Sequence, residues 1–94
     1  MALVIHPTIR TKLQQDDRKV TEEEICECFT NRSAGLLIDT RVENTTNPPT
    51  HWFISETDFG RKLKIVFISK DGDTIIKTAY EPNPEEIRIY NKYA

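Results

Sequence analysis

Residues 62–80 read KLKIVFISKDGDTIIKTAY, and this stretch decides the fold because it joins two apolar runs through a two-residue turn signal. Asp-Gly between such runs is a strong indicator of a β-hairpin, since the favoured turn places both central residues at positive φ. With Asp71 and Gly72 as the loop, Lys70 faces Asp73. The sequence therefore predicts antiparallel strands over 62–69 and 74–80.

The predicted register sorts the hairpin side chains onto two faces. Continued along the strands, it opposes Ile68 to Ile75 and Leu63 to Tyr80. A loop of three residues would exchange the two faces. The face expected to be core carries Leu63, Ile65, Phe67, Ile76, Thr78 and Tyr80. The other face is mixed, with bases at one end, and carries Lys62, Lys64, Val66, Ile68, Ile75, Lys77 and Ala79.

The flanking sequence adds three helices and two strands. Pro7 suits a first helical position, and Thr21 with Glu24 fits the capping-box pattern of a helix start. Asn83 is expected to cap the last helix. The predicted elements are a helix from 7 to 15, a polar turn at 16–19, a helix from 21 ended by 31–33, a strand from 36 toward 42, a loop over 44–50, a strand at 51–55, a turn at 59–60 and a short helix from 84.

This order predicts an α+β fold of two N-terminal helices, a four-stranded antiparallel meander sheet and a short C-terminal helix, with the helices packed on one face of the sheet. At 94 residues the chain, 1–94, is expected to form a single domain. No apolar run has the roughly 18 residues needed to cross a bilayer. The start of the chain lacks the basic segment of a signal peptide. We therefore expect a cytoplasmic protein that does not bind membranes.

Cysteine and charge patterns exclude several classes of function. Cys26 and Cys28 point to opposite sides of their helix with no further ligands nearby, so we expect free thiols and no metal. The net charge of −2 argues against a protein that coats nucleic acid. That value averages two unlike segments, because residues 16–27 hold six acids and two bases whereas 60–80 hold five bases and two acids. A local phosphate site is still compatible with it.

Three features together resemble a known family. They are His6-x-x-x-Arg10 at the start of the first helix, the helix–helix–meander order, and a last strand that ends Ile76-Lys77-Thr78-Ala79-Tyr80. In these features the chain is similar to the small bacterial toxin-type ribonucleases of the RelE/barnase-like superfamily, which includes EndoU and colicin-type domains, and most of all to the BrnT-type toxins. The resemblance implies a metal-independent endoribonuclease without a cofactor, RNA as substrate and a cognate antitoxin protein as partner.

RNA cleavage by the ribose 2′-hydroxyl needs a base, an acid and cations near the phosphoryl oxygens. Histidine ordinarily titrates near neutral pH, which makes His6 an acid–base candidate. Arg10 lies one helical turn later, where its guanidinium would grip a phosphate. The candidate catalytic residues are His6, Arg10, Thr78 and Tyr80, and the candidate RNA contacts are Lys12, Arg61 and Lys64.

Each of these residues also has a purely structural interpretation. His6 would then be a helix cap or a surface residue, and Arg10 would pair with Asp17 or Glu24 on the helical surface. Thr78 and Tyr80 would be the polar rim of the core, and the lysines would only solubilise the sheet. Trp52 would be core rather than a platform for a base. The alternative function is a non-enzymatic binding module, such as an antitoxin, an immunity protein or a phage-encoded regulator. A relative that has lost activity and a different small enzyme also stay open.

Overall fold

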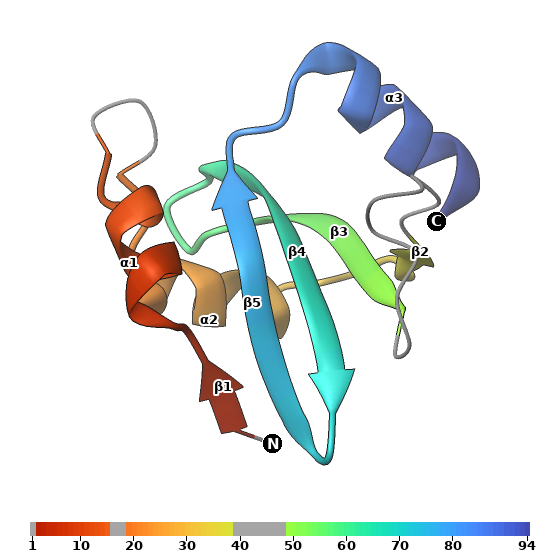
Figure 1. Cartoon of the computed structure of the whole chain (residues 1–94). Helices are drawn as coiled ribbons and strands as arrows, with labels where there is room; N and C mark the ends of the chain where they lie inside the picture. The colour runs from red at the N-terminus through yellow and green to blue at the C-terminus, as the bar shows by residue number, and fades with distance from the viewer. Residues whose placement is uncertain (1, 16–18, 39–48) are drawn as a thin grey trace.

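The computed structural model describes residues 2–15, 19–38 and 49–94, and shows an α+β fold (Figure 1). The parts of our predictions that fall on 16–18 and 39–48 lie outside the described residues. In chain order the elements are β1 (Ala2–Val4), α1 (Pro7–Leu13), α2 (Glu22–Thr30), β2 (Leu37–Ile38), β3 (Thr50–Glu56), β4 (Lys62–Lys70), β5 (Asp73–Tyr80) and α3 (Pro84–Tyr93).

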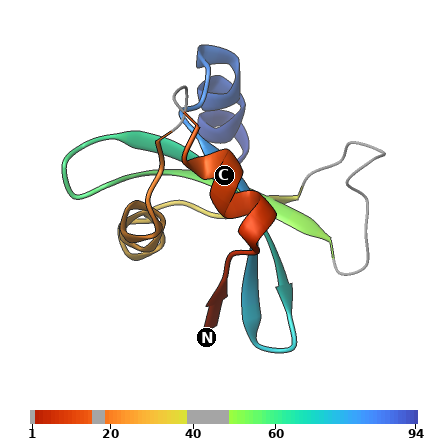
Figure 2. The same ribbon diagram turned by 60° about the vertical axis from the view of Figure 1, so that its left-hand side comes forward.

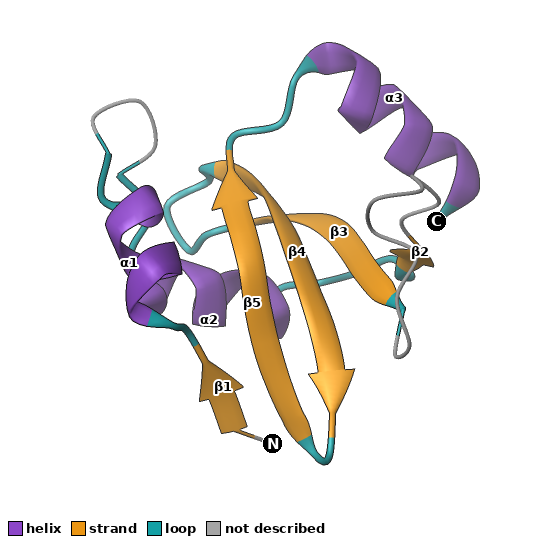
Figure 3. Cartoon of the chain, viewed as in Figure 1, coloured by secondary structure: helices purple, strands orange, loops and turns teal. Residues whose placement is uncertain are grey.

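The described strands form one mixed sheet of five strands in the order β1-β5-β4-β3-β2 (Figure 3). The predicted four-stranded antiparallel sheet is wrong in one respect, because β1 adds a parallel edge strand in which Leu3 pairs with Thr74 and Val4 with Ile75. The other described neighbours pair antiparallel, as a meander requires. A strand of three residues is too short to show periodicity, which is why the sequence pattern missed it.

A β-bulge interrupts the β4–β5 hairpin. The predicted register is confirmed from the turn to the pair Phe67 and Ile76, but the next pair is Val66 with Thr78, so Lys77 is an extra residue on β5. Beyond the bulge every side chain of β5 changes face. Our assignment of 78–80 is therefore wrong: Ala79 lies opposite Ile65 on the core face, and Tyr80 lies opposite Lys64 on the other face.

Helices cover both faces of the sheet (Figure 2). On one face α2 inserts Phe29 against Phe53 and Phe67, at ring-centroid distances of 4.8 and 5.4 Å. On the opposite face α3 places Tyr90 beside Trp52, with ring centroids 5.7 Å apart. The expectation that helices pack on one face alone is wrong for α3. Because β3 buries Phe53 on one side and Trp52 on the other, both faces need an apolar cover.

The helix starts follow their local sequence. Thr21 and Glu24 form the predicted capping box of α2, and Asn83 caps α3 in a second capping box with Glu86. The last helix is longer than expected and reaches Tyr93. On α2, Cys26 is exposed and Cys28 buried, and both are free thiols. Burial, with a smaller contribution from nearby carboxylates, raises the pKa of the Cys28 thiol to about 12, so this thiol stays protonated at neutral pH.

We expect Gly72→Ala to lower the free energy of unfolding by about 1 kcal/mol, because Gly72 adopts φ +83° and a Cβ there strains the backbone. No atom of the described residues lies within 4 Å of the added Cβ, so the loss reports backbone conformation alone. Gly35→Ala is the matched control, since it too has open space among the described residues but no positive φ. Urea unfolding of both variants measures the difference, and equal stabilities would contradict the turn geometry.

Candidate active site

Lys64, Tyr80 and Glu86 form a hydrogen-bonded group on the sheet face that carries α3. Lys64 Nζ donates to Glu86 Oε2 at 2.7 Å, and the Tyr80 hydroxyl donates to the same oxygen at 2.6 Å. The other oxygen of Glu86 accepts from the Asn83 backbone N–H at 3.0 Å. Two neighbouring strands and the first turn of α3 thus meet at one carboxylate.

The ammonium group of Lys64 is enclosed. The residue is only 8% exposed, and Nζ lies 4.5 Å from the ring centroid of Trp52 and 5.6 Å from that of Tyr80. Both distances are within the range of cation–π attraction. A buried cation needs an anion or several acceptors to offset its desolvation, and in this group Glu86 supplies the negative charge.

The pKa shifts of the two partners fix their protonation at neutral pH. Burial and the hydrogen bond to Glu86 raise the pKa of Tyr80, against an opposing effect of Lys64. Burial alone would raise the pKa of Glu86, but the hydrogen bonds from Lys64, Tyr80 and the Asn83 backbone outweigh it and lower that pKa. Tyr80 therefore keeps its proton as a donor, and Glu86 is a carboxylate.

The β-bulge is what brings two predicted site residues together. We expected Lys64 and Tyr80 on opposite faces, whereas the extra residue Lys77 puts them opposite each other on one face. Thr78 lies on the same face, paired with Val66, and is half-buried. Sequence reasoning missed Glu86 as a partner of this group. The capping box could have indicated this partner, because it uses one oxygen of the Glu86 carboxylate at the helix start and leaves the other oxygen able to accept hydrogen bonds from other elements.

Arg61, a predicted RNA contact, joins three parts of the fold. Its guanidinium contacts Glu24 of α2 at 3.0 Å, Glu81 after β5 at 2.9 Å and the carbonyl oxygen of Lys19 at 2.9 Å. Burial would lower the pKa of Arg61, but the hydrogen bonds to the two carboxylates outweigh it and raise that pKa. These contacts give Arg61 a structural role.

The three candidates on and before α1 lie at the β1 edge of the sheet. His6 is the exposed N-cap residue and makes no cap hydrogen bond with its side chain. Arg10 pairs with Glu22 of α2 at 3.4 Å, and Lys12 is exposed. Because β1 ends with Val4 beside Ile75, α1 begins alongside the middle of β5. The two side-chain donors described above at Glu86 are Lys64 and Tyr80, so His6, Arg10 and Lys12 are not among the described members of that group.

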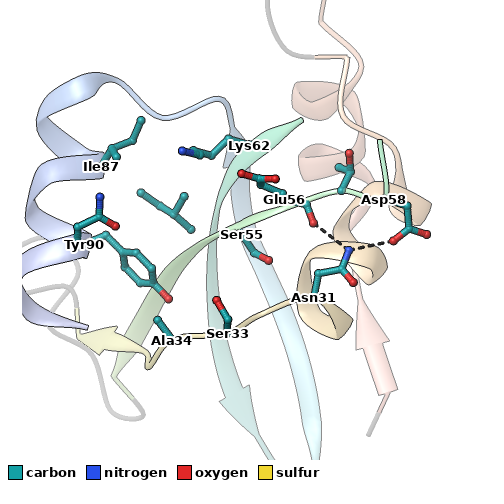
Figure 4. A pocket seen from close by; sticks show the side chains of 12 residues that line it. Asn31, Ser33, Ala34, Ser55, Glu56, Asp58, Lys62, Ile87 and Tyr90 are labelled. Carbon is teal, nitrogen blue, oxygen red and sulfur yellow. Dashed lines mark hydrogen bonds between the residues drawn. The ribbon is translucent and has the colours of Figure 1, made fainter. Parts of the chain in front are cut away.

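A cavity of about 610 Å³ lies between α3 and β3 (Figure 4). Ile54, Ser55 and Glu56 of β3 line it, together with the chain after α2 and the α3 residues Ile87, Tyr90 and Asn91. Asn31 Nδ2 closes one end by donating to the Glu56 carbonyl oxygen and to Asp58 Oδ1. Ser55 Oγ is buried with no hydrogen-bond partner among the described residues.

Neither metal ligands nor a membrane-spanning helix is found within the described ranges. No group of three or more His, Cys, Asp or Glu side chains there could hold a metal ion. None of the helices described has the length and apolar character to cross a bilayer. No protein-family model matches the chain, and neither a curated protein nor a solved structure matches it. The case for a function therefore depends on the side chains themselves.

We expect acid to destabilise the wild-type protein more than Glu86→Gln. A carboxyl whose pKa is lowered on folding stabilises the fold above its unfolded pKa of about 4.3 and loses that contribution as the pH falls through its folded pKa. Chemical denaturation between pH 7 and pH 2.5 measures the slope. Glu85→Gln on the same helix turn is the control and should keep the Glu86 contribution. Identical pH profiles for wild type and Glu86→Gln would contradict the network.

We expect Ser55→Ala to raise the free energy of unfolding by about 1 kcal/mol, because a buried hydroxyl without a partner carries an uncompensated desolvation cost. Ser69→Ala, at an exposed position of β4, should change stability little. Thermal and urea unfolding report both variants. A clear loss of stability in Ser55→Ala would show that the hydroxyl has a partner.

Proposed function

We propose that the protein is a metal-independent endoribonuclease of the RelE/barnase-like toxin type. The observation that carries the proposal is the convergence of Lys64 Nζ and the Tyr80 hydroxyl on one oxygen, from adjacent strands and on the same face as Thr78. A cation and a protonated phenol aimed at one oxygen suit the stabilisation of a phosphoryl oxygen. The Trp52 ring beside Lys64 completes an enclosed setting in which such interactions are stronger than in water.

The proposed reaction assigns the acid and the base. His6 takes the proton of the ribose 2′-hydroxyl, and the 2′-oxygen then bonds to phosphorus while the bond from phosphorus to the 5′-oxygen breaks. Tyr80, which keeps its proton at neutral pH, gives that proton to the departing 5′-oxygen. Lys64 and Arg10 stabilise the charge on the phosphoryl oxygens, and the products are a 2′,3′-cyclic phosphate and a 5′-hydroxyl.

The placement of α1 supports a part for His6. The parallel pairing of β1 with β5 starts α1 beside the strand that carries Thr78 and Tyr80. The exposed His6 side chain has no cap hydrogen bond to hold it. Lys12 is also exposed and is proposed as an RNA contact. Arg61, whose guanidinium pairs with Glu24 and Glu81, is proposed to contact RNA only through the part of its side chain that stays exposed.

The resemblance to the toxin-type ribonucleases is the basis for proposing RNA as substrate and a cognate antitoxin protein as partner. The two free thiols are the basis for proposing a cytoplasmic setting. The second candidate function is the non-enzymatic binding module. One observation favours it: both arginines proposed to meet RNA are paired with acids, Arg10 with Glu22 and Arg61 with Glu24 and Glu81. A pulldown with proteins encoded beside the gene distinguishes the candidates, since an inhibitor module should capture a partner that is itself toxic.

We expect the purified chain to cleave RNA in the presence of EDTA and to leave 2′,3′-cyclic phosphate ends. Lys64→Met, Tyr80→Phe and His6→Ala should each lower the cleavage rate about 100-fold or more, as losing a proton-transfer or charge-stabilising group does. Lys70→Met, which removes an exposed lysine near the hairpin turn, is the control and should cleave at the wild-type rate. Gel analysis of labelled RNA, with ribosome-bound messenger RNA as a second substrate, measures the rates.

In a host cell, wild-type expression should arrest growth and Tyr80→Phe should relieve the arrest at equal protein level. Circular dichroism shows whether each variant keeps its fold. The proposal is lost if the folded wild-type protein cuts neither RNA substrate and harms no host. It is also lost if Lys64→Met and Tyr80→Phe cut RNA as fast as Lys70→Met does.

A further inference from the structure

The acceptor at the centre of the candidate site belongs to α3 rather than to the sheet. Lys64 and Tyr80 lie directly opposite each other on β4 and β5, so the backbone pairing fixes their positions. Glu86 comes from the first turn of α3 and reaches into the space above these two side chains. The donors thus form part of the sheet, whereas the oxygen that they bind is brought by a separate element.

One carboxylate oxygen and one non-bridging phosphate oxygen offer the same chemistry to these donors. Each is a negatively charged acceptor able to take a hydrogen bond from an ammonium and another from a phenol. Distances of 2.7 and 2.6 Å are typical of charge-assisted hydrogen bonds. Since the side chains of Lys64 and Glu86 are only 10% and 18% exposed, an anion that replaced Glu86 would gain the same sheltered setting.

Helix α3 has a second anchor that does not depend on Glu86. Tyr90, one turn further along, packs its ring beside Trp52 and donates its hydroxyl to the Gly35 carbonyl oxygen at 2.7 Å. The first turn of α3 is connected to β5 by 81–83, a segment with a proline at 82. Withdrawal of Glu86 would therefore leave the helix attached through Tyr90.

We propose that Lys64 and Tyr80 form an oxyanion-binding site and that Glu86 fills this site as an internal substitute for a phosphoryl group. A phosphoryl group binds by displacing the Glu86 carboxylate. That this group belongs to RNA rests on the proposed function, whereas the competition between Glu86 and an oxyanion does not. Glu86 thereby limits occupancy of the site until a substrate makes enough other contacts to displace it.

The test is a titration of the isotope-labelled full chain with inorganic phosphate, followed by amide NMR. Glu86→Gln keeps an oxygen that accepts from Lys64 and Tyr80 but removes the competing charge. We expect it to bind phosphate at least ten-fold more tightly than wild type, with shifts at residues 64 and 80. Glu85→Gln, which removes an exposed carboxylate paired with Arg88, should bind phosphate as wild type does. Adding Lys64→Met to Glu86→Gln should abolish the gain.

Glu86→Asp is the second variant, for the case in which Glu86→Gln does not fold. It keeps the charge and the hydrogen bond from its own backbone N–H to Asn83 Oδ1, but it withdraws the carboxylate by one methylene. It too should bind phosphate more tightly than wild type. If neither folded variant binds phosphate more tightly than wild type, the inference is overturned. A gain that survives the addition of Lys64→Met also overturns it, because the anion then binds elsewhere.

Two oligonucleotides of the same sequence, one RNA and one DNA, identify the source of the phosphate. Tighter binding of either by Glu86→Gln, with shifts at 64 and 80, supports the oxyanion site, and a preference for RNA assigns it to a ribonucleotide. A chain that cleaves no RNA but gains phosphate affinity in Glu86→Gln keeps this inference and loses the ribonuclease. If the chain cleaves RNA through Lys64 and Tyr80 but Glu86→Gln does not bind phosphate more tightly, the ribonuclease proposal stands and the inference about Glu86 is lost.

Discussion

An ammonium group that is almost fully enclosed needs a negative charge or several acceptors beside it, and this requirement at Lys64 organises one whole side of the molecule. Glu86 meets it, and because Glu86 is also part of a capping box, the same carboxylate fixes where α3 begins. Tyr80 and Trp52 complete the enclosure. The ion pair between Lys64 and Glu86 therefore connects β4 to α3, and the hydrogen bond from Tyr80 connects β5 to the same carboxylate.

The two faces of the sheet consequently differ in kind. The α2 face is an aromatic and aliphatic core, in which Phe29, Phe53 and Phe67 touch edge to face. The α3 face combines an apolar contact at Tyr90 with buried charge at Lys64. An apolar face supplies stability without chemical selectivity, whereas buried charge is costly and is commonly associated with a functional site. This contrast is the physical reason for placing the anion-stabilising part of the proposed chemistry, Lys64 and Tyr80, under α3.

Local signals predicted local structure well. The capping boxes at Thr21 and Asn83 and the hairpin turn at Asp71 each depend on a few adjacent residues, and all three form as expected. The bulge could not be predicted, because alternation continues through residues 74–80 with or without an extra residue. Packing decides it: the small Ala79, and not Tyr80, lies opposite Ile65 on the core face.

Two of the three members of the candidate site were predictable from the sequence, and its geometry was not. Lys64 and Tyr80 were selected for their chemistry, but the partnership between them depends on a shift of one residue that only tertiary packing sets. Glu86 was not predicted as a member of the site, because its part in the capping box already accounts for a glutamate at this position. The β1 strand was not predicted because its pairing is also set by tertiary structure: its parallel partner lies about 70 residues away in the chain.

The clamp at Arg61 has a consequence for how the molecule opens. One guanidinium holds the start of α2 through Glu24, the chain before α2 through the Lys19 carbonyl oxygen, and the exit from β5 through Glu81. Segments that contact the same side chain tend to unfold locally together, as one cooperative unit. The start of α2 and the connection that leads into α3 belong to different layers of the fold, yet the opening of either removes a contact that Arg61 makes with the other, so their amide exchange with solvent should be coupled.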